Sequence, residues 1–87
     1  MRRVVLLPAA ERDLVWWQRT NSRTYARILR LISAALQTPF AGLGKPEPLR
    51  QVLPNTWSRR ITGQHRLVYR VFDDRIEIIA ARFHYGK

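Results

Sequence analysis

The sequence predicts an α+β fold in which two helices near the amino terminus pack on one face of a small antiparallel β-sheet. Residues 8–37 carry apolar side chains at helical spacing, whereas residues 49–83 carry short runs rich in β-branched and aromatic residues. Turn residues separate these later runs, which is typical of consecutive hairpins. A length of 87 residues suits one folding unit, so we expect residues 1–87 to form a single domain.

The first element is a short apolar segment, residues 2–7, that stops at Pro8. Its β-branched residues predict a buried strand. A helix is expected from Pro8 to about Arg19, because proline suits a first helical turn and Glu11 and Asp13 suit its positive end. The predicted buried face of this helix consists of Ala10, Leu14 and Trp17.

The second helix, from about Ser22 to Gln37, has the clearest local pattern, and the polar residues 20–22 ahead of it are good capping residues. Its apolar stripe consists of Tyr25, Ile28, Leu29, Ile32, Ala35 and Leu36. Another face carries arginines about one turn apart, namely Arg23, Arg27 and Arg30. The sequence leaves open whether these arginines are merely solvated, contact an RNA backbone or bind an acidic partner.

Residues 38–48 hold three prolines and two glycines, which predicts an ordered but irregular loop. Strand patterns follow at about 49–53, 57–62, 65–72 and 75–83. Tight turns are expected at Gly63-Gln64 and at Asp73-Asp74. With hairpins at the end of the chain the order is β–α–α–β–β–β, and a sheet covered on one face leaves the other face for a large ligand.

Net charge is the most informative part of the composition. Sixteen Lys and Arg residues stand against six acidic ones, for a formal charge of +10, and only two of the sixteen are lysine. The arginine fork matches phosphate oxygens bidentately, and a field of this size attracts polyanions. Nucleic acid is therefore the favoured partner, and an acidic protein is a compatible alternative.

The composition also argues against several classes of protein. The absence of cysteine excludes disulfides and thiolate metal sites, and it fits a cytoplasmic protein. No apolar run approaches the ~18 residues of a membrane span. The stretch before Pro8 is shorter than the roughly 7 to 15 apolar residues of a signal peptide, so we expect a mature, soluble protein with no membrane contact.

Few residues are available for acid–base chemistry: two histidines, His65 and His84, and six carboxylates. No spacing assembles three metal ligands, so neither a metal nor another cofactor is expected. The segment Gly42-Leu43-Gly44-Lys45 lacks the preceding strand and following helix of a phosphate-binding loop, which argues against nucleotide hydrolysis. Cleavage of a phosphate ester would need a base, an acid and fixed positive charge from the protein.

Four motifs follow one another from Thr38 to Tyr85. They are Thr38-Pro39-Phe40 with Gly42 and Gly44-Lys45-Pro46-Glu47-Pro48-Leu49, then Trp57-Ser58-Arg59-Arg60-Ile61-Thr62, then His65-Arg66-Leu67-Val68-Tyr69, and finally Arg82-Phe83-His84-Tyr85. Together they resemble the YoeB/Txe family of toxins from toxin–antitoxin modules. That family belongs to the RelE/ParE group, whose small antiparallel sheet with two helices agrees with the predicted order.

The resemblance implies an endoribonuclease that cleaves mRNA in the ribosomal A site and is neutralised by an acidic antitoxin of the YefM kind. Glu47 matches the family's general base, which takes a proton from a ribose 2′-hydroxyl. His84 matches the general acid, which protonates the departing 5′-oxygen. Arg66 matches the charge that stabilises the transition state, and Tyr85 matches an aromatic that orients the substrate. Two basic residues match positions near the substrate, namely Lys45 and Arg59.

Each of these residues also has a plainer explanation, because Glu47 could be a loop carboxylate, His84 a surface histidine and Arg66 part of a solvated strand face. Three rival functions follow: a non-catalytic toxin of the same fold that acts on gyrase, an RNA-binding module without catalysis, and a structural partner of an acidic antitoxin. The Glu47 and His84 combination favours the ribonuclease over the gyrase poison. Codon preference and the formation of a homodimer are left open by the sequence.

Overall fold

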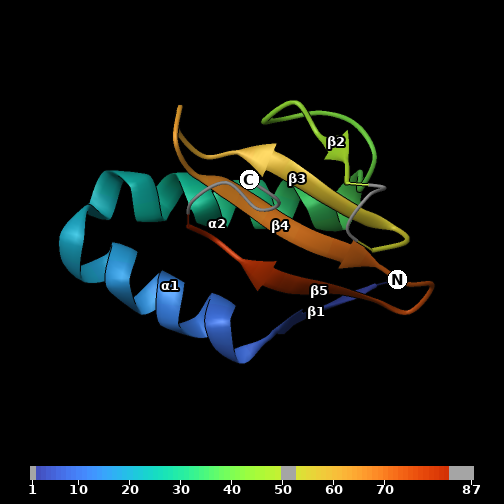
Figure 1. Ribbon diagram of the computed structural model, residues 1–87, viewed down its shortest axis with the longest axis horizontal. Coiled ribbons are helices and arrows are strands. Elements are labelled where there is room, and N and C mark those ends of the chain that lie inside the picture. Colours follow the sequence, from blue (N-terminus) through green and yellow to red (C-terminus); the bar gives the residue numbers. More distant parts are fainter. Residues whose placement is uncertain (1, 50–52, 83–87) are drawn as a thin grey trace.

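The computed structural model describes residues 2–49 and 53–82. Its elements are β1 (Arg3–Leu6), α1 (Pro8–Thr20), α2 (Ser22–Gln37), β2 (Glu47–Pro48), β3 (Thr56–Arg60), β4 (Arg66–Val71) and β5 (Arg75–Ala80). The predicted α+β class is confirmed, because both helices lie on the same side of a five-stranded sheet (Figure 1). Neither helix is long and apolar enough to cross a membrane, within the part of the chain that the structure describes.

The strands lie in the order β1-β5-β4-β3-β2. Three of the four neighbouring pairs are antiparallel, as expected from consecutive hairpins. However, β1 runs parallel to β5, so the sheet is mixed. Parallel neighbours require a long crossover, and the two helices belong to the chain between them. The sequence pattern reveals the local hairpins but not the distant partner of the first strand.

The first strand is not buried, which corrects the expectation for residues 2–7. β1 is an edge strand that pairs only with β5, and Val4 and Leu6 keep 37% and 36% of their surface exposed. An apolar run at a sheet edge and one in a central strand look alike in sequence, because periodicity does not report the number of neighbours.

The helices form as their sequences predict, with one exception. The Asn21 side chain caps α2 by accepting a hydrogen bond from the Thr24 N–H at 3.1 Å. On α1 the predicted inner residues, Ala10, Leu14 and Trp17, are buried. On α2 the expected stripe included Leu29, which is 44% exposed, whereas Leu31 is fully buried. Leu31 lies three residues after the buried Ile28, so both face the sheet.

The core lies between the helices and the sheet. From the sheet it receives alternate residues of β4 and β5, namely Leu67, Tyr69, Val71, Ile76 and Ile78. Burying one such aliphatic side chain contributes roughly 1.5 to 3 kcal/mol. The other residues of β4 point to the opposite face of the sheet, because side chains alternate along a strand. Arg66 is one of these.

The loop boundaries differ from the sequence pattern in two places. The strand expected at 49–53 is the shorter β2, whereas Leu49 and Leu53 are not in a strand and 50–52 lie outside the described residues. The expected tight turn at Gly63-Gln64 is part of a wider loop, closed by an Ile61 N–H to His65 carbonyl bond of 2.9 Å. The turn at Asp73-Asp74 is confirmed, with the Phe72 N–H bonded to the Arg75 carbonyl at 2.9 Å.

Candidate functional site

A buried arginine holds the loop of residues 38–46 against the sheet. Arg59 on β3 is fully buried and donates from Nε to the Tyr69 hydroxyl at 2.9 Å. Its terminal nitrogens donate to three loop carbonyls, those of Leu43 (2.8 Å), Ala41 (2.9 Å) and Thr38. The Tyr69 hydroxyl in turn donates to the Pro39 carbonyl at 2.7 Å. This network fixes the chain just ahead of β2.

Gly44 allows the same loop to approach closely. Its φ of +85° lies in the left-handed region, and a Cβ atom there would stand 2.7 Å from Leu31 Cδ2 and 3.1 Å from Arg59 Cβ. Its carbonyl accepts a 2.7 Å hydrogen bond from the Arg60 N–H. The backbone is thereby anchored to β3 three residues before Glu47.

The burial of Arg59 corrects its predicted contact with substrate. A guanidinium that is enclosed by protein and bonded to internal oxygens cannot reach an RNA phosphate in this conformation. The family motif gives the position of a basic residue but not the face of the strand on which it lies. Lys45 fits its predicted role better, because it is exposed two residues before Glu47.

Glu47 and Arg66 come together on the face of the sheet away from the helices. Glu47 on β2 lies opposite Ser58 on β3, and Arg66 at the start of β4 lies opposite Arg60. Arg66 Nη1 donates to Glu47 Oε1 at 2.7 Å, and the Ser58 hydroxyl lies 3.4 Å from the same nitrogen. The Glu47 side chain is 58% exposed, whereas that of Arg66 is 15% exposed.

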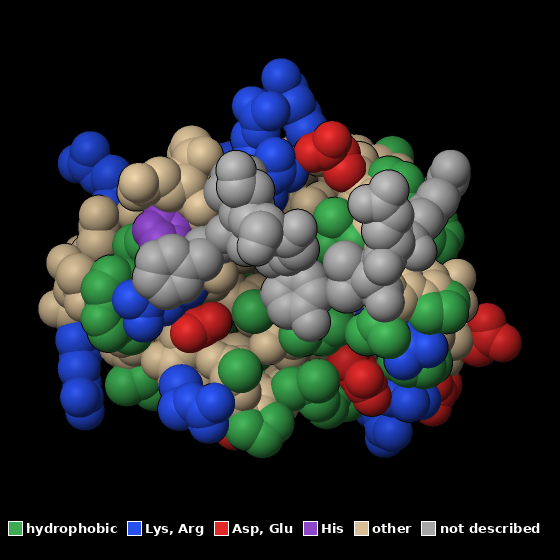
Figure 2. Space-filling view, viewed as in Figure 1, with side chains coloured by type: hydrophobic (Ala, Val, Ile, Leu, Met, Phe, Trp, Pro, Cys, Tyr) green, Lys and Arg blue, Asp and Glu red, His purple; other side chains and the backbone are tan. Residues whose placement is uncertain are grey.

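Electrostatics keep Glu47 ionised. The hydrogen bond from Arg66 and its charge, with a smaller contribution from Arg60, lower the pKa of the Glu47 carboxyl below its usual range. A carboxylate that is ionised at neutral pH and open to solvent can accept a proton from a bound ligand. Figure 2 shows basic side chains around the outline of this view, with a group at its upper edge, near β2.

The end of β5 lies beside the start of β4. Val68 pairs with Ala80, so the chain leaves the sheet close to Arg66. His84 and Tyr85, the predicted acid and substrate-orienting aromatic, lie outside the described residues, and their roles stay predictions. The other histidine, His65, packs edge-on against Trp17 with ring centroids 4.9 Å apart, as a structural histidine would.

The three helix arginines do not act as one surface. Arg27 donates to the carbonyls of Ile61 at 2.9 Å and Arg60 at 3.0 Å, so it fixes the β3–β4 loop. Arg23 and Arg30 are exposed. Sequence spacing placed all three on one face, but only the fold shows which of them reaches the sheet.

Sequence reasoning missed two neighbours of the carboxylate, Ser58 and Arg60. Both are in the quoted family motif, but their approach to Glu47 depends on the pairing of β2 with β3. No group of three or more His, Asp or Glu side chains that could hold a metal occurs within residues 2–49 and 53–82.

Sequence comparison places the chain among bacterial toxins. Residues 7–85 match the family described as "YoeB-like toxin of bacterial type II toxin-antitoxin system". The chain is 52% identical over 73 residues to Toxin YoeB of Escherichia coli K12, covering 84% of this chain and 87% of that one. The chain therefore belongs to the YoeB-like toxin family of type II toxin–antitoxin systems.

Solved structures agree with this assignment. The YoeB/ParE toxin from Agrobacterium tumefaciens superposes with a TM-score of 0.90 at 49% identity, covering 95% of this chain and 99% of that one. Two structures from Staphylococcus aureus also match. A YoeB dimer has a TM-score of 0.89 at 33% identity, over 97% and 98% of the two chains. A YoeB–YefM complex has a TM-score of 0.85 at 34% identity, over 98% and 99%.

Proposed function

We propose that this toxin is a ribosome-dependent endoribonuclease that cleaves mRNA in the A site and thereby stops translation. The observation that carries the proposal is the Glu47–Arg66 pair, in which a partly exposed carboxylate and a guanidinium are 2.7 Å apart at the positions of the family's base and transition-state charge. The surplus of basic side chains supports a polyanionic substrate. The reaction requires no cofactor, because RNA carries its own nucleophile.

The proposed reaction moves two protons and exchanges one bond for another. Glu47 takes the proton of a ribose 2′-hydroxyl, and the 2′-oxygen then forms a bond to the adjacent phosphorus. The bond from phosphorus to the 5′-oxygen breaks, and His84 gives that oxygen a proton. The products are a 2′,3′-cyclic phosphate and a 5′-hydroxyl. Tyr85 orients the substrate, and Lys45 contacts its backbone.

Arg66 has two parts in this scheme. In the free protein it neutralises and orients Glu47. When the scissile phosphate enters, its oxygens attract the same guanidinium, which stabilises the negative charge that builds on them in the transition state. When Arg66 turns to the phosphate, the ion pair is lost and the pKa of the Glu47 carboxyl rises. Glu47 then accepts a proton more readily at the step in which it acts as the base.

The partners follow from the same family. The S. aureus relatives occur as a YoeB–YefM complex and as a YoeB dimer. We infer that this toxin is neutralised by a cognate antitoxin of the YefM kind, whose acidic residues would complement the +10 charge, and that it forms homodimers. Its substrate and the ribosome place its action in the cytoplasm.

The proposal is tested by removing the 2′-oxygen of the substrate, which is the proposed nucleophile. Ribosomes are programmed with an mRNA that carries a 2′-deoxynucleotide immediately 5′ of the cleavage site, and a matched ribonucleotide mRNA is the control. The proposal expects the control to be cut, with 2′,3′-cyclic phosphate and 5′-hydroxyl ends, and the deoxy substrate to remain intact at that site. The cut should persist when a zinc and manganese chelator is added at constant magnesium.

Three outcomes would contradict the proposal. Cleavage at the deoxynucleotide, or products with 5′-phosphate ends, would mean that water and not the 2′-oxygen attacks. No cleavage of either mRNA by a folded toxin, together with DNA damage on expression, would favour the gyrase alternative. Binding of mRNA and ribosomes without cut ends would favour an RNA-binding module.

A further inference from the structure

The backbone at the end of β5 is held from both sides by side chains of α1. The Ala81 N–H donates to Asp13 Oδ2 at 2.9 Å, and the Ala81 carbonyl accepts from Trp17 Nε1 at 2.7 Å. Asp13 and Trp17 are four residues apart, so they lie on one face of the helix. Both polar backbone groups of a single residue are thus satisfied by one helix.

Both hydrogen bonds satisfy backbone groups of Ala81 that are buried away from water. Ala81 is fully buried and Trp17 is 5% exposed. β5 ends at Ala80, so the backbone groups of Ala81 no longer belong to the sheet and require other partners. One residue further, the Arg82 guanidinium stacks over the Trp16 ring at 3.8 Å. α1 therefore sets the direction of the chain where it leaves the sheet.

This point lies beside the start of β4 and, in the sequence, just ahead of His84. The pairing of Val68 with Ala80 places the end of β5 next to the strand that begins with Arg66. His84 follows Ala81 by three residues, a span of at most about 10 to 11 Å for an extended chain. Ala81 is thus the last backbone position before His84 at which α1 holds the chain by hydrogen bonds, among the residues that the structure describes.

We propose that Asp13 and Trp17 are positioning residues whose clamp on Ala81 places His84 for proton transfer. The inference rests on the proposed function, in which His84 is the general acid. It assigns a role in the reaction to a helix that lies on the other side of the sheet from Glu47. A misplacement of a catalytic group by about 1 Å can cost roughly 10²-fold in rate.

A double-mutant cycle tests this inference. Asp13→Ala is made in the parent toxin and in the His84→Gln variant, and single-turnover cleavage of ribosome-bound mRNA is measured for all four proteins. If Asp13 acts through His84, Asp13→Ala should slow the parent about 10- to 100-fold but slow the His84→Gln variant by less than about 3-fold. An equal loss in both backgrounds, or no loss in the parent, would overturn the inference.

Two matched variants distinguish the hydrogen bond of Asp13 to Ala81 from the negative charge of Asp13 and from a general effect of substitutions in α1. Asp13→Asn keeps an oxygen that can accept from Ala81, so it should restore most of the rate lost in Asp13→Ala. Glu11→Ala removes an exposed carboxylate from the same helix that has no hydrogen bond or ion pair of its side chain to any described residue, so its rate should equal that of the parent. A loss in Glu11→Ala equal to that in Asp13→Ala would contradict the clamp.

Amide hydrogen exchange tests the clamp independently of activity. In Asp13→Ala the Ala81 amide should exchange at least 10-fold faster, whereas the Ile78 amide within β5 should keep its parental rate. Trp17→Phe, which keeps the ring but lacks the indole N–H, should give the same pattern if it folds. If the Ala81 amide exchanges faster in Asp13→Ala but the parent toxin cuts no RNA, the proposed function is refuted and the clamp is not. If Ala81 exchange is unchanged in Asp13→Ala, the clamp itself is refuted.

Discussion

Arg59 faces the helices from β3, whereas Arg66 faces the opposite side of the sheet from the adjacent β4. Arg59 is fully buried and bonded to a hydroxyl and to loop carbonyls. Arg66 is paired with a carboxylate that is largely exposed. The two differ in whether their partner can be exchanged. The oxygens bonded to Arg59 are internal groups of the fold that no ligand can replace. A phosphate that binds at the exposed pair can compete with the Glu47 carboxylate for Arg66.

The comparison shows why residue type alone does not identify a functional arginine. Around Arg59 the surrounding oxygens belong to neutral groups, so the buried charge is stabilised by dipoles and not by an opposite charge. Around Arg66 a full charge is neutralised in the resting state. Substitutions at Arg59 should therefore change stability, and substitutions at Arg66 should change activity.

The largest effect is expected from Arg59→Met. The change leaves the Tyr69 hydroxyl and the loop carbonyls without their donor, and each buried group left unsatisfied costs about 1 to 3 kcal/mol. We expect a total loss of more than about 3 kcal/mol of unfolding free energy, or a Tm lower by roughly 12 °C or more. Arg59→Lys, which keeps the charge but not the fork, should fall between parent and Met variant. Parental denaturation curves for both would refute the loop-holding role.

Arg66→Ala should leave the fold intact and abolish the proposed cleavage of mRNA. Loss of one pre-placed donor to a developing oxyanion typically costs about 10² to 10³-fold, or roughly 2.7 to 4 kcal/mol of transition-state stabilisation. Single-turnover cleavage measures the loss, and thermal unfolding of the same sample shows whether the protein remains folded. The comparison between the two arginines fails if Arg66→Ala unfolds the protein, or if it cuts mRNA at the parental rate.

The pKa of Glu47 provides a smaller but direct measure of the ion pair. Because Arg66 lowers this pKa, the pair stabilises the fold above the unfolded-state pKa, and that stabilisation is lost as the pH falls through the folded-state value. Arg66→Ala should raise the titration midpoint of Glu47 toward that of an ordinary glutamate, followed by NMR of the carboxyl carbon. A midpoint that is identical in parent and variant would mean that the pair does not form in solution.

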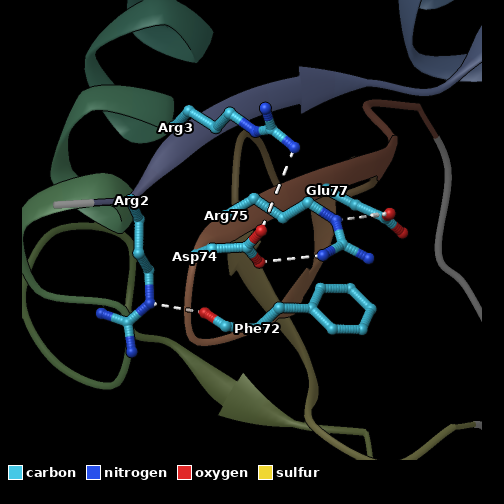
Figure 3. A network of polar contacts seen from close by, with 6 residues as sticks. All are labelled: Arg2, Arg3, Phe72, Asp74, Arg75 and Glu77. Atoms are coloured by element: carbon cyan, nitrogen blue, oxygen red, sulfur yellow. Dashed lines mark hydrogen bonds and ion pairs between the residues drawn. The ribbon is translucent and has the colours of Figure 1, made fainter.

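The smallest effect is expected at the opposite end of the sheet, where arginines form exposed ion pairs. Asp74 lies 2.9 Å from Arg75 and 4.0 Å from Arg3, and its side chain is 64% exposed (Figure 3). Exposed pairs contribute about 0 to 1 kcal/mol, so Asp74→Asn should shift the unfolding free energy by less than about 1 kcal/mol. Cleavage should be unchanged. A loss comparable to that of Arg59→Met would contradict the distinction between buried and exposed arginines.

The sequence predicted what local spacing determines. Both helices, the inner residues of α1 and the Asp73-Asp74 turn follow from periodicity and turn chemistry. The family motifs also contain Glu47 and Arg66, whose side chains the structure brings together. The sequence did not predict the features that depend on pairing between distant segments. The parallel partner of β1, the exposure of Leu29 and the inward direction of Arg59 depend on contacts between distant segments. The hold of Asp13 on Ala81 spans 68 residues and has no local signature.

The central claim is that Glu47 and His84 are the acid–base pair of an RNA-cleaving site. The most direct measurement is single-turnover cleavage of ribosome-bound mRNA by Glu47→Gln, His84→Gln and the double variant, each confirmed as folded by thermal unfolding. Because glutamine keeps size and much of the hydrogen bonding, folding should survive while each single change slows cleavage about 10² to 10⁴-fold. A folded double variant that cuts A-site mRNA at nearly the parental rate would contradict the account.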